Sequence, residues 1–197
     1  MTARATACSL LFSLGCCVRG ALGDLSLPGI FDHNMVLQRD GSVPIWGWAP
    51  AGQRVTVQYG ATIKLRVANV KGAWRVTLPA MPASAQPRDL IIRCGAEQLT
   101  LTNVVVGDVW LCSGQSNMEW PVRLAGNADA EIDAATQSLI RLAHVVNAAA
   151  LTPQPTCVVR WSVCTPASVP DFSAVSYFFG RELQRHLDIP LGLINCS

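Results

Sequence analysis

The sequence has little of what marks several large protein classes. Only 14% of its 197 residues are charged, and the formal net charge is +2. It has three histidines, far apart in the chain, and no cysteine or histidine spacing typical of a zinc site. Its longest mainly apolar stretch, residues 5–18, is too short to span a bilayer. These absences argue against a nucleic-acid-binding protein, a zinc protein and an integral membrane protein. Half of the residues are hydrophobic, which is enough to form the core of one large or two small domains.

The first 23 residues have the layout of a secretory signal peptide. Residues 1–4 are a short basic start, residues 5–18 are mainly apolar, and residues 21–23 offer the small side chains that a signal peptidase reads. A lipoprotein start at Cys16 is the alternative, but the residues before it match that signal poorly. We expect export with cleavage near Gly23, and a mature protein that is secreted, periplasmic or in the lysosomal lumen.

Removal of residues 1–23 leaves a neutral chain with an odd number of cysteines. Arg4 and Arg19 are the only charged residues of that segment, so 13 basic and 13 acidic residues remain. There is then no electrostatic case for binding nucleic acid or an anionic membrane. At least one thiol must be unpaired among the remaining cysteines, which are Cys94, Cys112, Cys157, Cys164 and Cys196. Cys157 and Cys164 could close a small loop, or could be small buried apolar residues.

Residues 24–103 have the pattern of a small all-β domain. Apolar residues alternate with polar ones in several short runs separated by glycine and proline turns, which predicts an antiparallel β-sandwich. The alternating residues are Val55, Val57 and Tyr59; Ile63, Leu65 and Val67; Trp74, Val76 and Leu78; and Leu99 and Leu101. Trp46, Trp48 and Trp74 could line a sugar-binding face, although tryptophans in small β domains more often fill the core.

Residues 104–197 have the pattern of an α/β domain with a parallel sheet. The apolar run from Val104 to Leu111 and the runs at residues 139–146 and 191–195 predict buried strands. Residues 173–187 predict a helix capped by Ser173 or Asp171, with an apolar stripe formed by Val175, Phe179, Leu183 and Leu187. Residues 127–138 predict a polar helix whose acids face solvent, and Trp161 is expected to anchor the proline-rich excursion at 147–170. The whole chain is therefore expected to be an α/β fold preceded by a small all-β sandwich.

Ser116 lies just past the carboxyl end of the first of these strands, where catalytic groups of α/β sheets gather. A serine nucleophile needs a base, usually histidine, and donors for the oxyanion, one of which can be a backbone N–H at a strand-to-helix turn. Gly114 would allow the tight backbone approach. The α/β-hydrolase elbow Gly-x-Ser-x-Gly does not fit, because Met118 stands at the second glycine position. On pattern alone, a structural turn serine is the stronger interpretation.

Five stretches of sequence resemble the sialate O-acetylesterase family, a branch of the SGNH hydrolases. Residues 108–121, Asp-Val-Trp-Leu-Cys-Ser-Gly-Gln-Ser-Asn-Met-Glu-Trp-Pro, resemble the family's nucleophile block. Residues 27–38 and 43–48 resemble its N-terminal β domain, and residues 171–183 with 191–195 resemble the next helix and strand of its catalytic domain. The resemblance implies an SGNH-like fold in which Ser116 takes an acetyl group from a sugar, its own N–H is one oxyanion donor, and no metal or organic cofactor takes part.

The resemblance also implies a base and further oxyanion groups that do not occur in residues 1–197. The family's glycine-rich block should follow Ser197, and its Asp-x-x-His motif should lie nearer the C-terminus. We expect His33, His144 and His186 to be structural or solvent-facing rather than catalytic. Asp108 is expected to hold backbone, and Cys112 has no neighbouring basic group that would activate its thiol.

The sequence therefore predicts a fragment or truncated form of an exported carbohydrate O-acetylesterase whose substrate is an O-acetylated sugar or sialoglycan. We expect the chain alone to be inactive or nearly so. The competing hypothesis is a noncatalytic carbohydrate-binding or adhesion protein in which the β domain is the working part.

Overall fold

One long strand, β7 (Glu97–Ser113), runs through the molecule and pairs with different strands along its length. The computed structural model describes residues 24–197, so the predicted signal peptide lies outside the described residues. The first half of β7 is antiparallel to β6 (Ser84–Cys94), and the second half is parallel to β10 (Leu191–Cys196). In between, β1 (Val36–Gln38) pairs with it in parallel. The predicted boundary at residues 103 and 104 falls inside this strand, where Asn103 has a left-handed φ of 60°.

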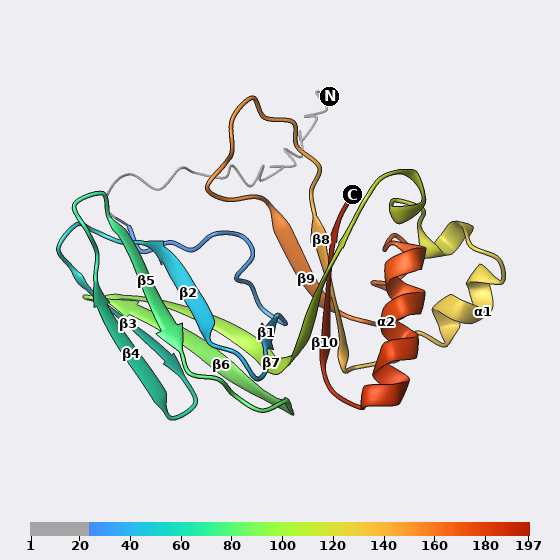
Figure 1. Ribbon diagram of the computed structural model, residues 1–197, viewed down its shortest axis with the longest axis horizontal. Coiled ribbons are helices and arrows are strands. Elements are labelled where there is room, and N and C mark those ends of the chain that lie inside the picture. Colours follow the sequence, from blue (N-terminus) through green and yellow to red (C-terminus); the bar gives the residue numbers. More distant parts are fainter. Residues whose placement is uncertain (1–23) are drawn as a thin grey trace, which may run out of the picture.

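The N-terminal half is a sandwich of two unequal antiparallel sheets (Figure 1). The larger continues from β7 and β6 to β3 (Arg54–Tyr59) and ends at β4 (Thr62–Val67). The smaller consists of β2 (Val43–Trp48) and β5 (Ala73–Leu78). Inward side chains of both sheets, such as Ile45 and Val57, share one core. The antiparallel β part predicted for this half of the chain is therefore present.

The C-terminal half contains a parallel sheet with strand order β7-β10-β8, where β8 is Ile140–Val145. An added strand, β9 (Val159–Val163), lies antiparallel to β8 at the edge. It falls in the stretch that sequence patterns presented only as a proline-rich excursion. Two 3₁₀ turns, η1 (Ser116–Met118) and η2 (Val122–Leu124), and the short helix α1 (Ala128–Asp133) follow β7. The predicted helix over 127–138 is thus only six residues long.

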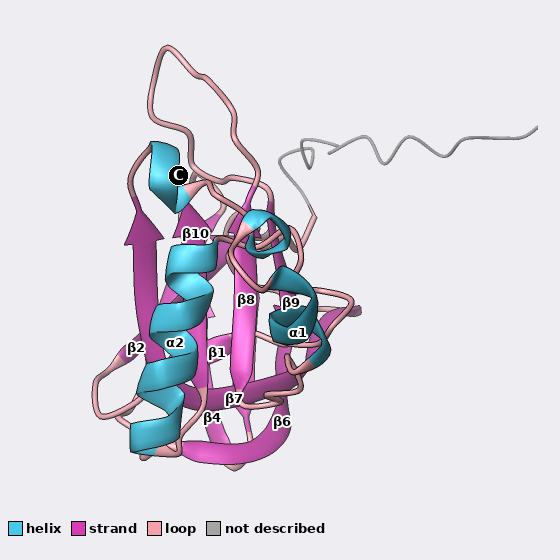
Figure 2. Ribbon diagram, turned by 90° about the vertical axis from the view of Figure 1, so that its right-hand side faces the viewer, coloured by secondary structure: helices cyan, strands magenta, loops and turns pink. Residues whose placement is uncertain are grey.

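Helix α2 (Ala174–Leu187) covers one face of the parallel sheet, as Figure 2 shows. Ser173 caps it as predicted, because its side chain accepts a hydrogen bond from the Ser176 N–H. The buried face is different from the predicted stripe. Tyr177 and Gly180 face the sheet, whereas Val175, Phe179 and Leu187 are about 40–46% exposed. The helix lies close to the sheet because small side chains, Ala174, Ser176 and Gly180, face it.

The opposite face of the parallel sheet is covered by chain from the N-terminal half. Trp161 on β9 is buried, and its indole N–H donates to the carbonyl oxygen of Ile30 at 2.9 Å. Gly192 on β10 packs tightly against this covering chain. A Cβ at this position would lie only 3.0 Å from Val36 and 3.1 Å from Trp161. The core of the N-terminal half therefore continues onto this face, and Trp161 anchors residues 147–170 as expected.

Candidate active site at the carboxyl end of β7

Ser116 lies in the turn that follows β7, at the carboxyl edge of the parallel sheet. It begins the 3₁₀ turn η1 and has a φ of 55°, a left-handed conformation that is uncommon for a residue with a side chain. Its side chain is exposed. Gly114 is needed just before it, because a Cβ at that position would lie 2.6 Å from Met118 Cγ. The turn thus presents an exposed hydroxyl on strained backbone, as nucleophile turns in α/β hydrolases do.

Two backbone N–H groups at this turn have no acceptor within residues 24–197. The Met118 N–H donates to Gln115 and the Glu119 N–H donates to Ser116, whereas the N–H groups of Ser116 and Asn117 make no hydrogen bond there. Free N–H groups at the start of a helical turn can donate to an anionic oxygen. The predicted oxyanion donor, the N–H of Ser116, is therefore unoccupied by other parts of the described chain.

A cavity of about 680 Å³ opens beside the turn. Gly114 lines one side of it, and the carboxyl ends of β8 and β10 with the loop at 145–158 line the rest. Its polar side chains include Asn147, Gln154 and Ser197. The loop residues were not singled out from the sequence. The signal that could have found them is their position directly after the predicted strand at 139–146.

None of the three histidines contacts Ser116 in the part of the chain that the structure describes. His33 bonds to Thr102 in the N-terminal half, and His186 Nδ1 lies 2.8 Å from the carbonyl oxygen of Glu182 on its own helix. His144 is exposed on β8 and lines a different hollow of about 300 Å³, together with Arg160 and Asp171. Each histidine thus has the structural or solvent-facing position that was expected.

Asp108 and Cys112, on the strand before the turn, have structural surroundings. Both carboxylate oxygens of Asp108 accept from Arg39, at 2.8 Å from Nε and 3.2 Å from Nη2. The expectation that Asp108 holds backbone is wrong, because its carboxylate accepts hydrogen bonds from the side chains of Arg39 and Gln38. Hydrogen bonding to Arg39 holds the pKa of Asp108 below its ordinary value. Burial raises the pKa of the Cys112 thiol, so it is a poor nucleophile at neutral pH.

The other candidate groups also have ordinary roles. The five cysteines of residues 24–197 are all free: Cys94, Cys112 and Cys164 are buried, and Cys157 and Cys196 are exposed. The loop-closing pair Cys157–Cys164 is therefore not formed. Among the acids of α1, Glu131 forms an ion pair with Arg181, and no cluster of potential metal ligands occurs in residues 24–197. No helix of that same stretch is long and apolar enough to cross a membrane.

The three tryptophans of the N-terminal half do not form one group. Trp74 is buried in the sandwich core, as tryptophans of small β domains usually are. Trp46 and Trp48 stand on the outer face of the β2–β5 sheet and are only half-buried. They line a second hollow, which lies away from the Ser116 turn.

Comparison with known proteins identifies the relatives of this chain. It is 35% identical over 199 residues to sialate O-acetylesterase of Rattus norvegicus, and the match covers 91% of the chain. The Homo sapiens sialate O-acetylesterase is 34% identical and matches 84% of it. This chain is a relative of the sialate O-acetylesterases. The resemblance seen in the sequence is thereby confirmed.

A solved structure supports the same relationship. A carbohydrate acetylesterase from Xanthomonas citri superposes with a TM-score of 0.84 and 34% sequence identity over 87% of the chain. The chain spans about a third of the length of its curated relatives, 36% of the rat protein, and 40% of the bacterial chain. A search against protein-family models gave no match. The shared architecture is a mixed, sheet-rich α/β fold with a small separate sheet.

Proposed function

We propose that this chain carries the nucleophile of a carbohydrate O-acetylesterase with an SGNH-like fold, and that the nucleophile is Ser116. The observation that carries the proposal is the turn itself, an exposed serine with φ of 55° at the carboxyl end of β7. Relatives named sialate O-acetylesterase and carbohydrate acetylesterase support the reaction class. The substrate is an acetyl ester on a sugar, of which sialic acid is the example given by the relatives' names.

In the proposed reaction, Ser116 Oγ attacks the acetyl carbonyl carbon while a base takes the hydroxyl proton. The carbonyl oxygen becomes an oxyanion and accepts a hydrogen bond from the N–H of Ser116, which has no other acceptor in residues 24–197. Collapse breaks the ester C–O bond and expels the sugar oxygen, which takes the proton from the base and becomes a hydroxyl. Water then hydrolyses the acetyl-serine to acetate and restores Ser116. The adjacent 680 Å³ cavity is large enough to hold a sugar ring.

The base is not assigned to any described residue, because no histidine among them contacts Ser116. The proposal for this chain is therefore limited to the nucleophile, one oxyanion donor and part of the substrate cavity. Residual catalysis without a base rests on binding and oxyanion stabilisation alone.

The nucleophile assignment can be tested by fluorophosphonate labelling. The protein used is the natural full-length form. We expect the probe to label the natural protein and not Ser116→Ala. Ser113→Ala is the matched control, because Ser113 is also exposed and lies three residues earlier at the end of β7. Loss of acetate release from an O-acetylated sugar should follow the same pattern. Equal labelling of natural protein and Ser116→Ala would exclude Ser116.

We also propose that the protein is exported, because residues 1–23 have the pattern of a signal peptide. N-terminal sequencing of protein recovered from outside the cytosol should begin at or near Asp24. Recovery only from the cytosol with Met1 retained would contradict it.

A further inference from the structure

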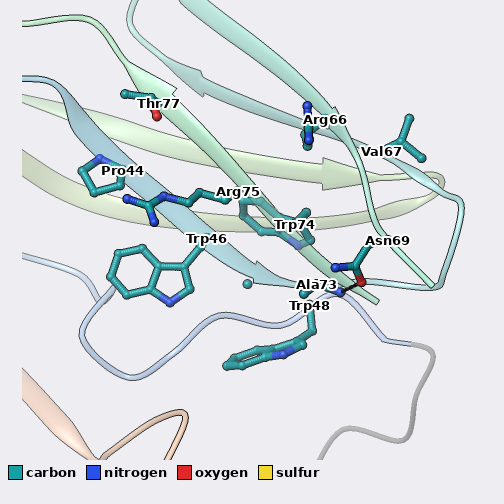
Figure 3. A pocket seen from close by; sticks show the side chains of 11 residues that line it. Pro44, Trp46, Trp48, Arg66, Val67, Asn69, Ala73, Trp74, Arg75 and Thr77 are labelled. Carbon is teal, nitrogen blue, oxygen red and sulfur yellow. Dashed lines mark hydrogen bonds between the residues drawn. The ribbon is translucent and has the colours of Figure 1, made fainter. Parts of the chain in front are cut away.

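The outer face of the small sheet is hollowed (Figure 3). The hollow measures about 700 Å³ and lies over β2 and β5, with the end of β4 on one side. Facing residues on the two strands form its floor in register, with Trp46 opposite Arg75 and Trp48 opposite Ala73. We call it the β2–β5 hollow. It shares no lining residue with the cavity beside Ser116.

Two indole rings give the β2–β5 hollow its apolar surface. Trp46 and Trp48 are two residues apart on β2, so their side chains leave the same face of the sheet about 7 Å apart along the strand. Figure 3 shows both rings on the same side of β2. Phe31 fixes the Trp46 ring through an edge contact, with centroids 4.6 Å apart and planes at 75°. Two half-buried, positioned indoles provide flat surface for the C–H face of a sugar ring.

The polar groups of the β2–β5 hollow are mostly hydrogen-bond donors. Arg66 and Arg75 are exposed, and neither guanidinium has a carboxylate or other hydrogen-bond acceptor within residues 24–197. The side-chain oxygen of Asn69 accepts from the N–H groups of Lys71 and Ala73, which leaves its NH₂ group as a donor. No aspartate or glutamate lines the hollow.

A donor-rich, acid-free hollow with two aromatic rings selects a particular kind of ligand. Neutral sugars offer as many hydroxyl donors as acceptors, so a neutral sugar would leave the guanidinium groups without a charged partner. A carboxylate accepts from arginine in a planar, two-bond geometry. Residues 24–197 as a whole carry equal numbers of basic and acidic residues, so the preference for an anion is local to the hollow rather than general.

We propose that the β2–β5 hollow is a second saccharide-binding site and that its ligand is a sugar bearing a carboxylate. Trp46 and Trp48 contact the sugar ring, and Arg75, which lies opposite Trp46, binds the carboxylate. Sialic acids and uronic acids share this chemistry. The site needs neither Ser116 nor its base, so it can hold a glycan whether or not the ester chemistry is assigned correctly.

Calorimetric titration of the Ser116→Ala protein separates this site from the proposed nucleophile. The probes are 3′-sialyllactose, trigalacturonic acid and, as the neutral comparison, lactose. We expect at least one acidic saccharide to bind and lactose to bind about tenfold more weakly or not at all, because a charged hydrogen-bonded pair is lost. Which acidic probe binds identifies the source of the carboxylate.

Two arginine variants locate the binding. Arg75→Gln should weaken binding of the acidic saccharide about tenfold. Arg54→Gln is the matched control, because Arg54 is also exposed on a β strand of this half but does not line the hollow, and it should bind as the parent does. Both variants keep the fold if their circular dichroism spectra and Tm match the parent. Binding of neither acidic saccharide, equal binding of lactose, or unchanged binding by Arg75→Gln would overturn the proposal.

Discussion

Gly180 of α2 lies against Leu193 of β10 so closely that a methyl group at position 180 would lie 2.4 Å from Leu193 Cδ1. Leu193 is fully buried at the centre of the parallel sheet, between β7 and β8. The side chain on β10 thus occupies the space that a larger residue on the helix would need. This contact sets the distance between the helix and the sheet that ends at the Ser116 turn.

Gly180→Ala is expected to lower stability despite its favourable effect on helix propensity. Overpacking of a core contact costs about 1–3 kcal/mol, whereas replacing glycine in a helix gains about 1 kcal/mol. A lower Tm in thermal unfolding is the expected result. Gly126→Ala is the control, since no heavy atom lies within 4 Å of a Cβ there, and its Tm should hardly change. A rise in Tm for Gly180→Ala would show that Leu193 moves aside freely.

Replacing Ser116 by glycine should relieve the strained turn. A side chain in the left-handed region costs about 1–2 kcal/mol, which exceeds the entropy that glycine loses on folding. In urea unfolding, Ser116→Gly should therefore be about 1 kcal/mol more stable than Ser116→Ala, although both lack the hydroxyl. At Ser113, on the strand, the order of the same two variants should reverse. The same order at both positions would contradict a strained φ at Ser116.

The Asp108–Arg39 ion pair should make stability depend on acid pH. Hydrogen bonding to Arg39 lowers the pKa of Asp108 in the folded protein below its ordinary value of 3.8, so the folded state binds this proton less readily than the unfolded state. The stabilisation is therefore present above pH 3.8 and is lost as pH falls through the lower, folded pKa. Unfolding free energies measured across this range should differ between parent and Asp108→Asn at neutral pH and converge in acid. If the difference in unfolding free energy between parent and Asp108→Asn became larger in acid, the pKa of Asp108 would not be lowered by folding.

Alkylation should divide the five cysteines into two groups. Cys157 and Cys196 are exposed and should react with iodoacetamide in the native protein. Cys94, Cys112 and Cys164 are buried, and burial raises the pKa of each thiol, that of Cys164 to about 11. They should react only after unfolding, because little thiolate forms and access is blocked. Mass spectrometry of native and denatured samples gives the pattern, and rapid native labelling of Cys164 would contradict the packing.

The local sequence patterns predicted where strands and helices lie better than they predicted which face of each element is buried. Alternation at Val55, Val57 and Tyr59 correctly predicted a strand with these residues inside. The same alternation at Ile63 and Leu65 also marks a strand, but β4 is at the sheet edge and both residues are more than half exposed. Alternation reports a strand and cannot report whether another layer lies over it.

Two further elements show what local patterns miss. The strand β6 escaped notice because Pro87 and polar residues occupy its first half, which is exposed next to a bulge in its pairing with β7. On α2, an apolar stripe with Val175 and Phe179 was expected inside, but the buried face combines Tyr177 with small residues such as Gly180, which lies against β10. Ser116 was placed correctly past the end of a strand, whereas the cavity beside it depends on loop packing that sequence spacing does not encode.

The continuity of β7 has a consequence for any attempt to divide the molecule. Because β1 pairs with residues 105–107 and the first half of β6 pairs with Val104 and Val106, a cut after residue 103 would separate strand partners that belong to different halves. Buried strand edges left in this way favour aggregation. The two halves should therefore melt in a single cooperative transition, and either half expressed by itself would have to include the whole of residues 97–113.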